Sequence, residues 1–214
     1  MKVLVIGANG QIGKHIVNQL QNSNEHTVRA MVRKEEQAEA LQQSGVEAVV
    51  TNLEGSVDGI TEAAKGCDAV IFTAGSGAST GSDKTILIDL DGAVKSIEAA
   101  EQAGAKRFIM VSAIQTHKRE NWSEKIAHYS AAKHYADRML EASALNYTIL
   151  RPGGLLNEPG TGKIAAADSL SRGDIPREDV ARTAITALTE ENAHTKAFDL
   201  ISGDTDIAEA LKKV

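Results

Sequence analysis

The sequence predicts an α/β fold: a doubly wound parallel sheet in a single compact domain with a small C-terminal lid. Three observations predict it. Short apolar runs recur along the chain, helical patterns fill most of the gaps between them, and glycines directly follow the first run. The predicted strands lie at residues 2–6, 27–32, 46–50, 69–73, 107–111, 146–150 and 197–201. No repeat or linker divides the 214 residues, so we expect one domain over 1–214.

Glycines at fixed spacing end the first apolar run. Gly7 would permit a tight turn, Gly10 would let the backbone approach a pyrophosphate, and Gly13 would let the next helix pack close to the strand. Strand, glycine turn and helix form the first half of a dinucleotide-binding unit, with the anion at the positive helix end. The cofactor contacts predicted from this turn are Gly7, Asn9, Gly10, Gln11, Ile12 and Gly13.

A structural turn without a ligand is the alternative interpretation. A P-loop is set aside, because Ala8 stands where its first glycine is needed and His15 where its Ser or Thr is needed.

The residues after the second predicted strand bear on the choice of nucleotide. In this fold, an acid there binds the ribose 2′-hydroxyl of NAD, whereas arginine accommodates the 2′-phosphate of NADP. Arg33 and Lys34 occupy this place and no acid precedes Glu35, so we expect NADP(H) to be preferred over NAD(H). The same pattern disfavours a methyltransferase. The alternative is two solvated cations at a helix start. Weaker signals for cofactor contacts follow the third and fourth strands, at Asn52, Leu53, Ala74 and Gly75.

Candidate catalytic residues follow the fifth predicted strand. Ser112 ends that strand, and Tyr129 and Lys133 stand four residues apart at the start of a helix, hence on one face. The structural alternatives are a strand-end cap, a core aromatic residue and a surface cation. The apolar face predicted for this helix comprises Ala132, Tyr135, Ala136, Met139, Leu140 and Ser143, with His134, Asp137, Arg138 and Glu141 facing away.

With these residues in this order, the chain resembles the short-chain dehydrogenase/reductase superfamily over essentially its whole length. It is most similar to the compact, atypical branch with NmrA-like regulators, flavin/biliverdin reductases and bacterial proteins named epimerase/dehydratases. The segments that resemble this branch in particular are residues 128–133, 147–153 and 176–181.

The resemblance implies roles for the candidate residues. Tyr129 would be the general acid/base, Ser112 would orient the substrate oxygen, and Lys133 would hold the nicotinamide ribose. Lys133 would also lower the pKa of the tyrosine, which is about 10 in an unperturbed side chain. Pro152 and Gly153 would lie along the carboxamide of the nicotinamide.

One departure from the family pattern concerns a proton relay. The predicted helix at 88–103, ended by Gly104, carries Asp89, with Asp91 nearby, where many members have an asparagine. The only tryptophan, Trp122, would either close over the substrate or anchor its loop.

The expected function is that of an NADP(H)-dependent oxidoreductase acting on a small carbonyl, quinone or flavin-like substrate. The alternatives are a sugar epimerase or dehydratase that recycles its nucleotide, and a non-catalytic redox sensor. Substrate-binding loops are expected at 75–88, 113–128 and 153–177, with residues 152–177 lacking regular structure. The Gly/Ser-rich part of the first, residues 75–82, is expected to be either a mobile lip or a plain connection.

Composition limits the classes of partner and the cellular compartment that we expect for this protein. The net charge of −6 without a basic stripe disfavours nucleic acid, and no segment suggests a signal peptide or membrane span. Cys67 is the only cysteine, which precludes an internal disulfide, and the six histidines lack metal-ligand spacing, so no metal is expected. We expect a cytoplasmic protein, a monomer or homodimer, whose partner is a small-molecule substrate.

Overall fold

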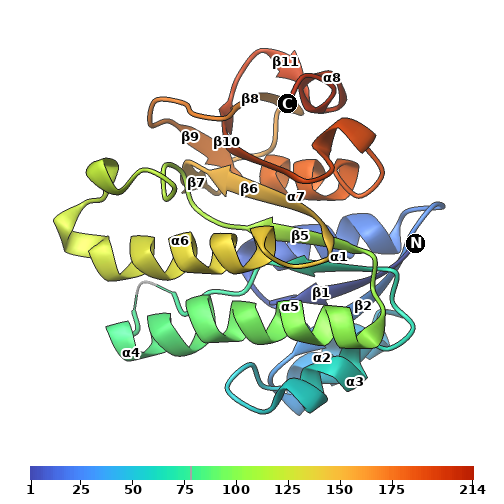
Figure 1. The fold of residues 1–214 in the computed structure, drawn as a ribbon. Helices are drawn as coiled ribbons and strands as arrows, with labels where there is room; N and C mark the ends of the chain where they lie inside the picture. The colour runs from blue at the N-terminus through green and yellow to red at the C-terminus, as the bar shows by residue number, and fades with distance from the viewer. Residues whose placement is uncertain (78) are drawn as a thin grey trace.

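The structure is a computed structural model, and it describes residues 1–77 and 79–214. A nine-stranded sheet runs through the molecule in the order β11-β8-β10-β6-β5-β4-β1-β2-β3 (Figure 1). Its strands are β1 (Lys2–Ile6), β2 (Thr27–Val32), β3 (Glu47–Val50), β4 (Ala69–Phe72), β5 (Arg107–Val111), β6 (Asn146–Pro152), β8 (Lys163–Ala167), β10 (Lys196–Ser202) and β11 (Thr205–Asp206). All seven predicted strands are present, and the doubly wound sheet is confirmed.

The order of the strands places the carboxyl ends of three of them together. β1 pairs in parallel with β2 on one side and with β4 on the other, and its last residue, Ile6, lies level with Met31 and Phe72. Successive strands are added on one side of β1 up to β3 and on its other side from β4 onward, and open α/β sheets bind ligands at this point, where the strand order reverses. The residues that follow β1, β2 and β4 therefore meet at one edge.

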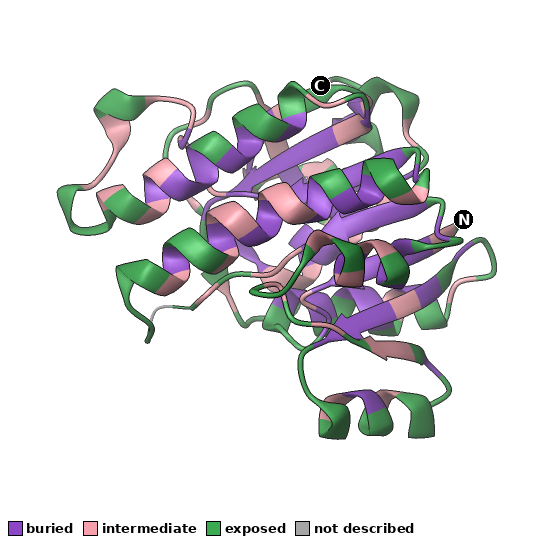
Figure 2. Ribbon diagram, turned by 60° about the horizontal axis from the view of Figure 1, so that its bottom comes forward, coloured by how far each residue is buried: buried purple, intermediate pink, exposed green. Residues whose placement is uncertain are grey.

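Helices cover both faces of the sheet. They are α1 (Gln11–Gln21), α2 (Glu35–Gln43), α3 (Val57–Ala64), α4 (Ser82–Lys84), α5 (Asp91–Ala103), α6 (Ala127–Glu141), α7 (Arg177–Thr186) and α8 (Ile207–Leu211), with the π-helix η1 (Thr85–Leu90) and 3₁₀ turns η2 (Arg119–Asn121), η3 (Glu124–Ile126) and η4 (Glu191–Ala193). Alternate residues of β1 enter two separate cores: Val3 and Val5 pack under α1, α2 and α7, and Leu4 and Ile6 pack under α3, α5 and α6. Figure 2 shows the buried strands between the two helical layers. None of the helices in the described part of the chain is long and apolar enough to cross a membrane.

The helix predicted at 88–103 is longer than expected and changes type. It runs on from α4 through η1 into α5, and it ends where predicted, at Gly104, with a left-handed φ of 77°. Single π turns within a helix are rare and occur frequently at functional sites. Here the π turns carry Asp89, which is buried.

The prediction of a loop over 152–177 is wrong in part. This stretch holds β8 and two three-residue strands, β7 (Gly154–Leu156) and β9 (Asp174–Pro176), which pair with each other as a separate sheet. β8 joins the main sheet antiparallel to β10. Its alanines have low strand propensity, and its pairing partner lies further along the chain, so the local sequence carried little strand signal. β8 and β11 extend the main sheet beyond β10, the strand predicted at 197–201.

The predicted faces of α6 are wrong in part, although Ala132, Ala136 and Leu140 are buried as predicted. Tyr135 and Met139 are 48% and 47% exposed, whereas His134 and Asp137 are buried. The buried face carries polar side chains because their partners come from other elements. Such partners offset the cost of burying a charge, and they leave no trace in the apolar pattern of the helix.

Candidate active site

The glycine turn has the close contacts that its sequence predicts. A Cβ on Gly13 would lie 2.2 Å from the carbonyl oxygen of Gly7, and a Cβ on Gly7 would lie 2.7 Å from the backbone nitrogen of Ala74. Gly7 also has a left-handed φ of 87°. The turn thus brings β1, α1 and the segment after β4 together more tightly than any side chain would allow.

The first turn of α1 is open to an anion. Gly10 is the N-cap, no side chain caps the helix, and no acidic residue lies in its first turn. The backbone N–H of Lys14 donates to Gly10, so those of Gln11, Ile12 and Gly13 precede the first bond within the helix. Free N–H groups at a helix N-terminus beside such a glycine turn fit the pyrophosphate of a dinucleotide. Asn9 lies exposed within the same turn.

Arg33 and Lys34 follow β2 at the same edge of the sheet. Both are exposed, and Lys34 is the N-cap of α2. Neither forms an ion pair or a side-chain hydrogen bond with the described residues, whereas nearby Arg29 is bound to Glu47. The two cations are therefore available to a ligand.

The weaker cofactor candidates lie around the same edge. Asn52 is exposed, and its carboxamide oxygen accepts the N–H of Glu54. Leu53 packs close to Gly92 of α5 and so contributes to a core. Ala74 and Gly75 follow β4, beside Gly7 and Asp89 respectively. Ala78, within the expected loop 75–88, lies outside the described residues.

Lys133 is a buried cation with a buried partner. Its ammonium donates to the carbonyl oxygen of Val111 at 3.2 Å and lies 3.7 Å from a carboxylate oxygen of Asp89. The aromatic rings of Phe72 and Tyr129 lie around the ammonium, with their centres 5.9 and 6.0 Å away. The other carboxylate oxygen of Asp89 accepts the N–H of Ser76, so this pair also holds the segment after β4.

Ser112 and Tyr129 line one cavity of about 210 Å³. Ser112 is 5% exposed, and its hydroxyl lies near the Asp137 carboxyl but makes no hydrogen bond of ordinary length with any described residue. Its backbone N–H donates to Leu150, which fixes the end of β5 against β6. A buried hydroxyl without a partner is rare in folded proteins, and a ligand oxygen in the cavity would satisfy it.

Pro152 and Gly153 form part of the wall of the same cavity. Both are buried, and a Cβ on Gly153 would lie 2.0 Å from the carbonyl oxygen of Gly173. The end of β6 and the segment before β9 therefore meet at the rim.

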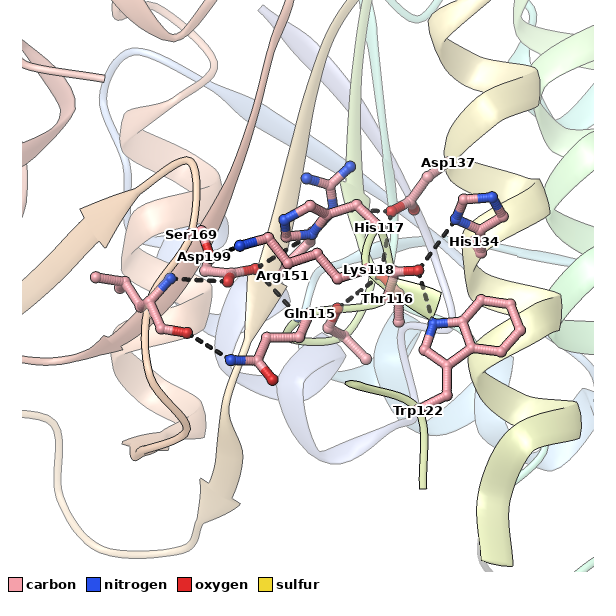
Figure 3. A network of polar contacts seen from close by, with 12 residues as sticks. Gln115, Thr116, His117, Lys118, Trp122, His134, Asp137, Arg151, Ser169 and Asp199 are labelled. Carbon is pink, nitrogen blue, oxygen red and sulfur yellow. Dashed lines mark hydrogen bonds and ion pairs between the residues drawn. The ribbon is translucent and has the colours of Figure 1, made fainter. Parts of the chain in front are cut away.

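A network of polar contacts supports this wall from behind (Figure 3). Asp199 of β10 is fully buried and accepts the backbone N–H groups of Gln115 and Leu170, at 3.2 and 3.0 Å. The side chain of Gln115 donates to the carbonyl oxygen of Leu170 at 2.7 Å, and Lys118 donates to Ser169. The expected substrate loops 113–128 and 153–177 are thus bound to each other.

A second part of the network lies under α6. Arg151 donates to Asp137 at 3.0 Å, and burial nevertheless raises the pKa of the Asp137 carboxyl above its usual range. Arg151 and the neighbouring Ser112 hydroxyl act in the opposite direction on this pKa. Asp137 thereby links the strand that carries Arg151 to the helix that carries Tyr129 and Lys133.

Trp122 anchors its loop and does not line the cavity. Its indole N–H donates to the carbonyl oxygen of Thr116 at 3.0 Å, and its ring meets that of His134 edge-on, with 5.6 Å between centroids. His134 contacts the same carbonyl through Nδ1 at 3.0 Å. Because a carbonyl only accepts, Nδ1 carries the proton. Of the two roles considered for Trp122, the structure favours the anchor.

Three residues of the cavity and its supporting network were not predicted from the sequence. Asp137 was expected to face solvent, and Asp199 and Arg172 were not singled out. A charged residue between apolar strand positions, such as Asp199, was the one available signal, because such a residue must have a buried partner.

A match to a known family identifies the family of the chain. The model of a family described as NAD(P)H-binding matches residues 7–191, from the first glycine of the turn to beyond α7. The chain belongs to this NAD(P)H-binding family.

Its relatives include enzymes named for two kinds of reaction. The uncharacterized sugar epimerase YhfK of Bacillus subtilis (strain 168) is 64% identical over 214 residues, covering 100% of both chains. A Bacillus halodurans protein, provisionally called an NAD-dependent epimerase/dehydratase, superposes with a TM-score of 0.93 at 43% identity, covering 100% of both chains. The anaerobillin reductase ChuY of Escherichia coli O157:H7 has a TM-score of 0.80 at 26% identity, covering 96% of this chain and 99% of its own. These neighbours of the NAD(P)H-binding family confirm the resemblance to atypical short-chain dehydrogenases/reductases.

Proposed function

We propose that the protein is an NADP(H)-dependent oxidoreductase that reduces a small carbonyl, quinone or flavin-like compound, with Tyr129 as the general acid. One observation carries this proposal. Ser112 and Tyr129 line one cavity, Lys133 is buried beside the Tyr129 ring, and all three lie at the sheet edge that holds the glycine turn.

The roles of the residues follow from their surroundings. The Ser112 hydroxyl would donate to the substrate oxygen, since it makes no hydrogen bond of ordinary length with any described residue. Tyr129 would transfer its phenolic proton to that oxygen, and the Lys133 ammonium would stabilise the resulting phenolate. When bound, the reduced nicotinamide supplies the hydride for the substrate carbon. Hydride and proton together convert a carbonyl into an alcohol.

The preference for NADP(H) rests on Arg33 and Lys34. Two exposed cations that pair with no acid among the described residues follow β2, where the 2′-phosphate of the adenosine ribose is expected. A guanidinium pairs with a phosphate through two parallel hydrogen bonds. NAD(H) has only a hydroxyl at this place, so it gains less from either residue.

Calorimetric titration with NADPH, NADH and NADP⁺ tests the cofactor. We expect NADPH to bind at least about tenfold more tightly than NADH, and Arg33→Ala to remove most of that ratio. Arg138→Ala, which changes an exposed arginine on α6, is the matched control and should leave the ratio unchanged. Equal binding of NADPH and NADH by the unchanged protein would refute the preference.

Loss of turnover in Tyr129→Phe tests the chemistry. Oxidation of NADPH is followed at 340 nm (the absorbance of the reduced nicotinamide) with carbonyl, quinone and flavin acceptors. We expect a loss of about a hundredfold or more in kcat with cofactor affinity retained, because the general acid is removed and the ring stays. Unchanged turnover in this variant would remove Tyr129 from the mechanism.

A sugar epimerase is the second candidate, and the name of the Bacillus subtilis relative favours it. An epimerase returns the hydride to its substrate, so it consumes no cofactor overall. Conversion of a sugar substrate with no net NADPH consumption would establish this alternative.

A further inference from the structure

The cavity that holds Ser112 and Tyr129 combines aliphatic and hydroxyl side chains with one charged residue at its rim. Ile114, Ile126 and Leu155 contribute aliphatic side chains to its lining, and the hydroxyl-bearing residues of the lining are Ser112, Thr116, Tyr129 and Ser130. Among the described residues that line it, Arg172 is the only one with a charge, and no carboxylate joins it. An apolar pocket with a few placed polar groups is typical of a site for a small organic molecule.

The backbone on both sides of Arg172 is fixed. Leu170 donates its N–H to Asp199 and accepts the side-chain amide of Gln115. Gly173 accepts the N–H of Gly154 at 2.9 Å. The segment that carries Arg172 is therefore anchored two residues before it and one residue after it. Figure 3 shows the anchoring contacts of Asp199 and Gln115.

The guanidinium itself is only partly used. One terminal nitrogen donates to the backbone carbonyl oxygen of Asn121 at 2.8 Å, and no ion pair forms with Arg172 in the described part of the chain. By contrast, Arg151 and Arg182 pair with acids of the protein. The remaining donors of Arg172 thus bond to no described residue, and they lie at the rim of a cavity whose described lining carries no other charge.

We propose that Arg172 binds a carboxylate of the substrate, so that the protein selects small anionic carbonyl compounds over neutral ones. The position of the reacting carbonyl in this inference rests on the proposed function. The binding of the carboxylate by Arg172 does not depend on that function. The carbonyl lies at Ser112 and Tyr129, the body of the substrate lies against the aliphatic wall, and the carboxylate lies at the rim. A planar guanidinium matches a carboxylate through two hydrogen bonds. One guanidinium also balances the single charge of a carboxylate, whereas a phosphate monoester carries about two charges.

The first experiment measures binding alone. Benzoate and benzamide, which match in shape and differ in charge, are titrated calorimetrically into the protein with NADP⁺ present. We expect benzoate to bind about tenfold more tightly than benzamide, as one charge-assisted contact at a partly exposed site allows. Arg172→Met should abolish this ratio, Arg172→Lys should retain part of it, and the surface control Arg138→Met should leave it unchanged.

The second experiment measures turnover with 4-formylbenzoate and 4-formylbenzamide. We expect kcat/KM to favour the carboxylate about tenfold in the unchanged protein, and Arg172→Met to remove this preference through KM. If neither aldehyde is reduced while benzoate still binds through Arg172, carbonyl reduction fails and the anion site stands.

Three results would overturn the anion site. These are benzoate binding no more tightly than benzamide, neither compound binding at all, and a preference for benzoate that persists in Arg172→Met. Each can be read from the titration without any catalysis, so a failure of the proposed function remains distinguishable.

Discussion

The Lys133 ammonium lies 3.7 Å from the carboxylate of Asp89, and both side chains are almost completely buried, at 4% and 1% exposure. Asp89 reaches this position from the π-helical turns of η1, and Lys133 from the second turn of α6. The pair joins these two helices under the ring of Tyr129. A buried cation beside the candidate acid is thus already balanced before any ligand binds.

Removing the charge of Asp89 should destabilise the protein. Asp89→Asn leaves the buried Lys133 ammonium without a negatively charged partner, so we expect the free energy of unfolding to fall by about 3 kcal/mol. Urea unfolding measures this change. Asp91→Asn is the control, because its pair with Lys95 is half exposed, and it should cost at most about 0.5 kcal/mol. Equal effects of the two substitutions would contradict the buried pair.

Two glycines of the turn should differ in their tolerance of a methyl group. A Cβ on Gly13 meets the Gly7 carbonyl oxygen at 2.2 Å, whereas one on Gly10 meets it at 3.1 Å. Gly13→Ala should therefore cost about 2 kcal/mol of stability and weaken NADPH binding, and Gly10→Ala should cost less stability. Thermal unfolding and calorimetry measure the two quantities. A larger stability loss in Gly10→Ala would be inconsistent with the close contact at Gly13.

The stability contributed by His134 should depend on pH. Burial lowers the pKa of His134 below its ordinary value of 6.5, because charging the ring in the folded state is unfavourable. Its contribution is therefore present above pH 6.5 and is lost as the pH falls through the lowered folded-state pKa. His134→Asn keeps a donor near Nδ1 and does not titrate. Unfolding free energies from pH 7.5 to 5 should show the advantage of the unchanged protein shrinking on acidification, and a constant difference would refute this.

Trp122 should stabilise its loop through its indole N–H. Trp122→Phe removes the hydrogen bond to the Thr116 carbonyl, which is worth about 1 kcal/mol. Tyr135→Phe removes an exposed bond from Arg119 and serves as the control, with an expected cost of at most about 0.5 kcal/mol. Urea unfolding of the two variants measures the difference. If Trp122→Phe lowers the free energy of unfolding no more than the control does, the hydrogen bond from Trp122 to Thr116 does not stabilise the loop.

The sequence alone determined the elements whose signals are local. The strands of the parallel sheet appear as short apolar runs because both of their faces are buried. The turn after β1 is marked by Gly7 and Gly13, because only glycine allows such close backbone contacts. The order of these signals along the chain was enough to predict the doubly wound fold. In that fold, Ser112, Tyr129 and Lys133 lie at the same edge of the sheet.

Only the tertiary structure decided which polar residues are buried and what they face. Asp137 lies on the buried face of α6 because Arg151 reaches it from β6, and Asp89 is buried because Lys133 meets it from another helix. Arg172 reaches the cavity because Asp199 and Gln115 anchor the preceding residues. In each case the partner is distant in the chain. Periodicity records only which residues avoid water, whereas a buried charge depends on a partner that folding supplies.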